Sequence, residues 1–170
     1  ETAKIVFGIA FETGRNKLVD HAKRAYRIGI NDTSKPYYEI NLAPTDAKIE
    51  RHVTRFTNKL RDYVFEQVES NLVGVKELSA VDAEAASIIF KVLAHRAKMI
   101  DEGEIRRAYN AGLADGYKAQ GAEEISLLCS DSQPCEICSK STLRWKTGDA
   151  IIYEELPPLH PECNCRLKRN

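Results

Sequence analysis

Two short motifs near the end of the chain decide the fold: Cys135-Glu136-Ile137-Cys138 and His160-Pro161-Glu162-Cys163-Asn164-Cys165. The first is a C-x-x-C turn, whose two intervening residues let both thiolates face one ion. The 21 residues between Cys138 and His160 are enough for a hairpin that brings the two motifs together. This pattern predicts a zinc site in a small C-terminal lobe.

Five candidate ligands compete for the four positions of a tetrahedral zinc site: Cys135, Cys138, His160, Cys163 and Cys165. Cys135 and Cys138 form the first pair, completed by His160 and either Cys163 or Cys165. Cys163 and Cys165 can also both bind the ion, because alternate residues of a strand face the same side. His160 would then not touch the ion and would instead hydrogen-bond to one of its ligands.

All five cysteines lie between residues 129 and 165. Such clustering favours a metal site in a reducing compartment over a disulfide framework, which would spread its bridges over the fold. A redox dithiol and incidental buried cysteines remain alternatives. Cys129 has no partner at ligand spacing and is predicted to be a buried strand residue.

Apolar periodicity predicts helices before this lobe and short strands within it. The expected helices cover residues 1–28, 45–72, 79 to about 100, and 104–119. Thr45 is the expected N-cap of the second helix and Ser79 that of the third, and Gly121 ends the last. The expected strands cover residues 125–129, 142–146 and 151–153. We therefore expect an α+β fold with a helical body, residues 1–121, and a Cys-rich zinc-binding knob, residues 122–170.

The composition is that of one ordinary domain: 170 residues, 43% apolar, with 25 basic and 25 acidic residues. Zero net charge excludes the strongly basic class of nucleic-acid-binding proteins. The longest apolar run, residues 5–11, is far shorter than the roughly 20 residues of a membrane span. We expect a soluble protein without a membrane partner. Because the chain begins with Glu1, we expect an excised or processed piece.

The hypothesis that this chain is an enzyme rests on Glu162 alone. His160-Pro161-Glu162 and Pro134-Cys135-Glu136-Ile137-Cys138 match the two halves of the zinc deaminase signature, but in reversed order. Solvated positions are expected for the histidines on charged helix faces, which are His21, His52 and His95. The sequence predicts no enzyme.

Beyond the metal motifs, the order of several features is informative: Glu104-Ile105-Arg106-Arg107-Ala108-Tyr109-Asn110-Ala111-Gly112, then Tyr117-Lys118-Ala119, Gly121, Asp131 and the two cysteine motifs. Over residues 82–169 this order resembles the phage Mu F-like minor head protein family, also called phage head morphogenesis proteins. The resemblance does not cover residues 1–44. It implies a structural protein of a tailed phage or prophage, present in the virion or the host cytoplasm.

The resemblance also implies partners and site residues. The implied partners are the portal and the capsid or scaffold proteins and, in some members, packaged DNA. Glu104, Arg107 and Asn110 match the family's helix signature, and Asp131 matches the acid before its first cysteine. From the residues themselves, Glu104 and Arg107 can pair at i, i+3, Asn110 can anchor a loop, and Asp131 can cap the metal-binding turn. Members also occur fused to toxin or enzymatic domains.

The second hypothesis is a nucleic-acid-binding module. Arg166, Lys168 and Arg169 follow the second cysteine motif and could contact phosphate. With balanced overall charge, such binding would be weak and would fall steeply with salt. The third hypothesis is a zinc-dependent enzyme, deaminase-like or otherwise hydrolytic, or a fragment of a toxin fusion.

Overall fold

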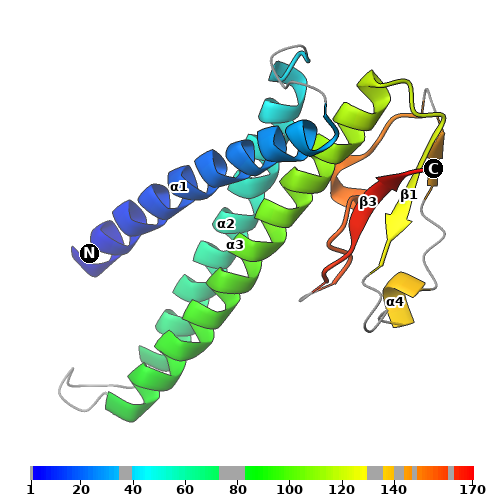
Figure 1. Cartoon of the computed structure of the whole chain (residues 1–170). Helices are drawn as coiled ribbons and strands as arrows, with labels where there is room; N and C mark the ends of the chain where they lie inside the picture. The colour runs from blue at the N-terminus through cyan, green and yellow to red at the C-terminus, as the bar shows by residue number, and fades with distance from the viewer. Residues whose placement is uncertain are drawn as a thin grey trace.

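The computed structural model describes residues 2–34, 40–72, 83–129, 136–139, 144–146, 149–160 and 163–170. In chain order the elements are α1 (Thr2–Asp32), α2 (Ala43–Leu72), α3 (Ala83–Ala119), β1 (Glu124–Leu128), α4 (Glu136–Ser139), β2 (Arg144–Lys146), a 3₁₀ turn (Tyr153–Glu155) and β3 (Arg166–Arg169). Three long helices lie together and the small sheet lies beside the C-terminal half of α3 (Figure 1). The predicted α+β fold class is confirmed.

Two glycines let α1 and α3 approach until their backbones touch. An added Cβ at Gly29 would lie 3.0 Å from the backbone nitrogen of Leu113, and one at Gly112 would lie 2.9 Å from the backbone nitrogen of Ile30. Each would also overlap a carbonyl oxygen of the facing helix, that of Tyr109 or Tyr26. Only a residue without a side chain fits at this crossing.

The first two helices occur where the sequence predicts them, with different starts and ends. α1 continues to Asp32, and α2 begins at Ala43, two residues before the expected cap Thr45. The Asn41 side chain accepts the Ala43 N–H at 3.3 Å, which satisfies one donor of the first turn. The Thr45 hydroxyl instead donates to Asp115 on α3 at 3.0 Å.

A single helix, α3, replaces the two helices expected over residues 79–100 and 104–119. Gly103, at the expected break, lies inside it. One glycine in a helix interior costs only about 1 kcal/mol relative to alanine, so it does not by itself end a helix. The expected cap at Ser79 lies outside the described residues. The predicted end is confirmed, since Gly121 follows the helix with a φ of 72°.

The sheet has the order β2-β1-β3, with both pairs antiparallel. β1 and β2 confirm two of the three predicted strands. The third expected strand is wrong, because residues 151–155 form a loop and the 3₁₀ turn. β3, which the sequence reading treated as a basic tail, pairs with β1, so that Leu167 lies opposite Leu127 and is buried.

The hydrophobic core is continuous from the helices to the sheet. Tyr26, Ile49 and Val53 of the helices belong to the same buried cluster as Ile125 and Trp145 of the sheet. The boundary expected at residue 121 stays a prediction. Among the described residues, no helix combines the length and apolarity that a membrane crossing requires.

Candidate metal centre

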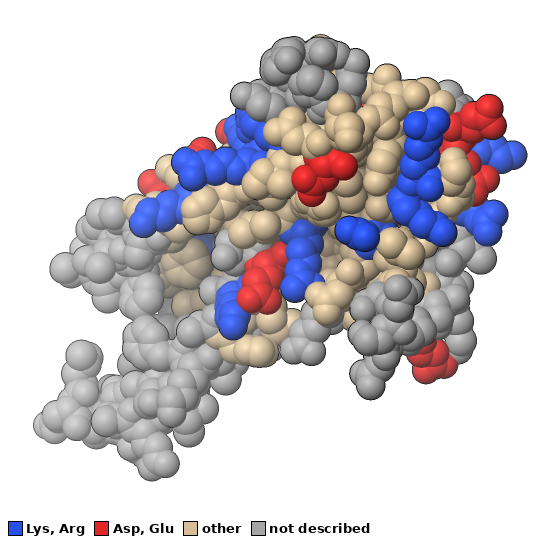
Figure 2. All heavy atoms as spheres, viewed as in Figure 1, with Lys and Arg blue, Asp and Glu red and all other residues tan. Residues whose placement is uncertain are grey.

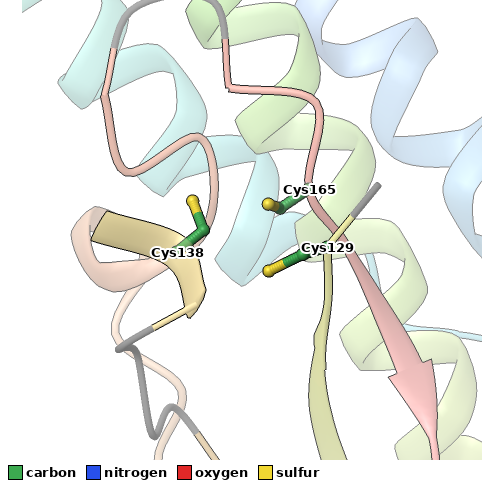
Figure 3. A group of neighbouring side chains, drawn as sticks. All are labelled: Cys129, Cys138 and Cys165. Carbon is green, nitrogen blue, oxygen red and sulfur yellow. The ribbon is translucent and has the colours of Figure 1, made fainter. Parts of the chain in front are cut away.

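Four cysteines and one histidine come together from three separate stretches of chain. Cys138 lies in α4, Cys129 follows β1, and His160, Cys163 and Cys165 precede β3. Cys129 and Cys165 extend from neighbouring strands toward Cys138 (Figure 3). The four described cysteines form no disulfide with one another, and three of them are buried. The cluster therefore concentrates soft donor atoms where water has little access.

The shortest distances in the cluster join Cys138 to two of its neighbours. Its Sγ lies 3.3 Å from His160 Nε2 and 3.5 Å from Cys163 Sγ. Around a tetrahedral zinc ion with Zn–S bonds of about 2.3 Å, two sulfur atoms lie about 3.8 Å apart. The two distances from the Cys138 sulfur thus agree, within a few tenths of an ångström, with the spacing that one ion requires, and the ligand atoms of Cys138, His160 and Cys163 all lie within 4.8 Å of one another.

The structure brings together four of the five predicted ligands: Cys138, His160, Cys163 and Cys165. Cys163 and Cys165 are both buried, as expected of alternate residues in an extended segment. Cys165 nevertheless belongs to a separate group, in which its sulfur lies within 4.8 Å of those of Cys138 and Cys129. The predicted ligand Cys135, and Asp131 with its predicted capping role, lie outside the described residues.

Cys129 is the donor that sequence reasoning missed, and the expectation of a buried strand residue is wrong. It is half-buried and follows β1 by one residue. Leu128 pairs with Arg166, so the next pair of the same antiparallel ladder is Cys129 and Cys165. Cys129 can be recognised as a donor only from the pairing of β1 with β3, and the spacing between cysteines does not reveal that pairing.

Two neighbouring thiols have oppositely shifted pKa values. Burial alone would raise the pKa of the Cys163 thiol, but hydrogen bonds from the backbone of Cys165 and Leu159 outweigh it and lower that pKa. Burial raises the pKa of Cys165 to about 12, against an opposing hydrogen bond with Cys138 and with smaller raising effects of Cys129 and Cys163. A metal ion must displace these protons, so metal binding is expected to strengthen as pH rises.

Side chains of helix α3 hold the main chain of the ligand-bearing segment. The Arg106 guanidinium donates to the Cys163 carbonyl at 2.7 Å and also to the Asn164 side chain. Asn110 is fully buried, and its amide donates to the carbonyls of Pro157 at 3.2 Å and Cys165 at 3.4 Å. Its Oδ1 accepts the Leu167 N–H at 2.8 Å. The prediction that Asn110 anchors a neighbouring loop is confirmed.

Arg107 holds the segment that precedes His160. Its guanidinium donates to the carbonyls of Glu154 at 2.9 Å, Leu156 at 2.6 Å and Pro158 at 3.2 Å. Its Nε lies 3.5 Å from Glu104 Oε1, which confirms the predicted i, i+3 pair as a charge contact without hydrogen-bond geometry. The signature residues of α3 therefore act on the ligand-bearing segment through main-chain carbonyls.

His52 is buried, so its expected solvated position is wrong. Only 4% of it is exposed, and its Nε2 lies 3.3 Å from Glu104 Oε1. Its ring also packs edge-on against Tyr153, with the ring centroids 5.3 Å apart. His21 and His95 are exposed, as predicted. His52 differs from the other two because α2 packs against α3 and sets it beside Glu104, a residue 52 positions further along the chain.

No family model, curated protein or solved structure matches this chain. The site itself must therefore indicate the chemistry. Thiolate and imidazole donors select soft or borderline cations over Mg²⁺ or Ca²⁺, which take oxygen ligands. The described donors could hold such an ion. Glu162, on which the enzyme reading depends, lies outside the described residues.

Proposed function

We propose that this chain is a structural minor head protein of the phage Mu F-like type, whose C-terminal segment is held in place by a zinc ion. One observation carries the proposal. Arg107 and Asn110, two residues that the resemblance singles out in α3, hydrogen-bond to the segment that carries His160, Cys163 and Cys165. The helix signature and the metal motif are thus parts of one structural unit, and the proposed role is assembly rather than catalysis.

Zinc is the proposed ion because the donors are thiols and an imidazole at tetrahedral spacing. In a structural site the ion adds stability directly, since the ligands are assembled only in the folded chain. The three carbonyls held by Arg107 and the contacts of Asn110 also retain this segment. Because the ion binds only the C-terminal ligands, metal removal should loosen the segment that carries them and leave the long helices folded.

Chelator titration tests the metal half of the proposal. The purified chain is titrated with a zinc chelator while released zinc, far-UV circular dichroism and amide hydrogen exchange are followed. We expect stoichiometric zinc release, faster exchange in residues 163–170 and little loss of helical signal. Cys138→Ser should reproduce the exchange pattern without chelator, whereas Thr57→Ser on α2 should not. Unchanged exchange after complete zinc loss would refute a structural role.

Co-purification tests the assembly half. The tagged chain is co-expressed with the portal and the capsid or scaffold proteins encoded beside its own gene, and complexes are isolated by size exclusion. We expect a defined complex with the portal or procapsid. Neighbouring genes that encode no such proteins, or a chain that elutes alone beside assembled portals, would overturn the proposal.

A second candidate function, nucleic-acid binding, is favoured by one feature of the sheet. Its face away from α3 carries four exposed cations: Arg144, Lys146, Arg166 and Lys168. Basic side chains gather over this end of the molecule, with acidic ones beside them (Figure 2). A gel-shift assay with duplex DNA at low salt tests this candidate. Lys168→Glu should weaken binding and Lys17→Glu on α1 should not, and no shift by the wild-type chain removes it.

A further inference from the structure

The metal-binding donors fall into two overlapping groups. In the part of the chain that the structure describes, Cys138, His160 and Cys163 form one group whose ligand atoms all lie within 4.8 Å of one another. Cys129, Cys138 and Cys165 form the other. The described donors thus form two triangles that share the Cys138 sulfur, instead of one four-cornered shell.

Strand pairing holds the second group in place. Continuing the antiparallel register from Leu128 and Arg166 by one pair sets Cys129 directly opposite Cys165. Directly opposite residues have Cβ atoms about 5 Å apart, which places both sulfurs within reach of a shared neighbour. Asn110 accepts the Leu167 N–H and donates to the Cys165 carbonyl, so the Cys165 side of this pair is anchored to α3.

The second triangle has nearly the size that a thiophilic ion requires. The ligand atoms of the group all lie within 4.8 Å of one another, and an ion at the centre of an equilateral triangle with edges of that limiting length would lie about 2.8 Å from each corner. Zinc–sulfur bonds are about 2.3 Å long. Each sulfur would therefore move inward by at most about 0.5 Å, which a rotation of roughly 15–20° about the Cα–Cβ bond provides within one rotamer well.

We propose that Cys129, Cys138 and Cys165 form a second metal position for a thiophilic cation such as Zn²⁺, with the Cys138 thiolate bridging it to the position formed by Cys138, His160 and Cys163. This inference rests on the proposed zinc site and extends it to two ions. A thiolate sulfur has lone pairs for two cations. Each thiol that binds releases its proton to solvent, and water completes the coordination where the protein supplies three donors.

Native mass spectrometry of the whole chain, refolded with excess Zn²⁺ under a reductant, counts the ions directly. We expect two zinc ions in the wild-type chain and one in Cys129→Ser, because that variant loses a donor of the second group alone. His160→Gln should also retain one ion, held by the three thiolates. The control His21→Gln removes an exposed histidine of α1 and should retain two.

The outcomes separate this inference from the proposed function. One ion in both the wild-type chain and Cys129→Ser overturns the second position and leaves the structural zinc site standing. No ion in the wild-type chain overturns both. A thiol count on the same metal-free sample must give five free cysteines, so that oxidation does not account for a missing ion. Circular dichroism of each variant shows that the helices are intact.

Discussion

Replacing Gly112 by alanine should separate α1 from α3. The new Cβ would lie 2.9 Å from the Ile30 backbone nitrogen and 3.0 Å from the Gly29 Cα, and closer still to the Tyr26 carbonyl oxygen. All three are backbone atoms of α1, so no side-chain rotation relieves the overlap. The same substitution at Gly14, on the exposed part of α1, meets no atom within 4 Å.

The magnitude follows from two opposing effects. Alanine improves helix propensity by about 1 kcal/mol. Ordinary van der Waals contact begins near 3.4 Å, so α1 must retreat by at least about half an ångström from a core that includes the fully buried Tyr26 and Ile30. Overpacking of this kind costs up to about 3 kcal/mol and occasionally more. We expect Gly112→Ala to lose a net of about 2 kcal/mol, and Gly14→Ala to gain about 0.5–1 kcal/mol.

Urea unfolding followed by circular dichroism measures both variants, and Gly103→Ala serves as a second control within α3. A Cβ at Gly103 would lie 3.8 Å from Pro158 Cγ, an ordinary contact, so this variant should also be stabilised. For a chain of this size the loss at Gly112 corresponds to a melting temperature lower by about 4–8 °C. A Gly112→Ala variant as stable as Gly14→Ala would refute the close helix crossing.

Three further predictions follow from the hydrogen bonds and the pKa shifts. Asn110→Ala should destabilise the chain by about 3 kcal/mol in urea unfolding, because it leaves the buried Leu167 N–H and nearby carbonyls without partners; a loss no larger than that of the exposed Asn16→Ala would contradict this. Burial and the hydrogen bond to Asp32 raise the pKa of Tyr109 to about 12, so the folded state retains a proton that the unfolded state releases from about pH 10. The free energy of unfolding should therefore fall between pH 10 and 12, less steeply in Tyr109→Phe, and equal slopes in the two chains would exclude this cause. Zinc affinity should rise between pH 6 and 8, roughly, as thiol protons are displaced, and a competition titration that shows no pH dependence would argue against thiolate ligands.

Much of the helical architecture could be predicted because its signal is local. The apolar positions of residues 45–72 repeat at helical spacing, and the structure has α2 over nearly the same range. The expected break at Gly103 fails for an energetic reason, since a single glycine costs a helix only about 1 kcal/mol. β3 could not be recognised from its four residues, because an isolated short strand has no stability of its own and forms only against β1.

The same distinction separates the two parts of the metal centre. The spacing of Cys138, His160 and Cys163 was sufficient to predict their association, because short motifs with tetrahedral donors carry their geometry within a few residues. The place of Cys129 depends on its strand partner Cys165, and the spacing alone therefore gives no indication of it.

The sequence by itself determined where most of the helical residues lie, which donors are available for a metal, and that all the cysteines lie near the end of the chain. Only the tertiary structure decided which of these groups meet. It buried His52 against Glu104, set Gly29 against Gly112, and divided the donors around Cys138 into two groups. The physical reason is range: backbone periodicity acts over a few residues, whereas ion pairs, helix crossings and strand registers join residues far apart in the chain, and their energies appear only once the chain has folded.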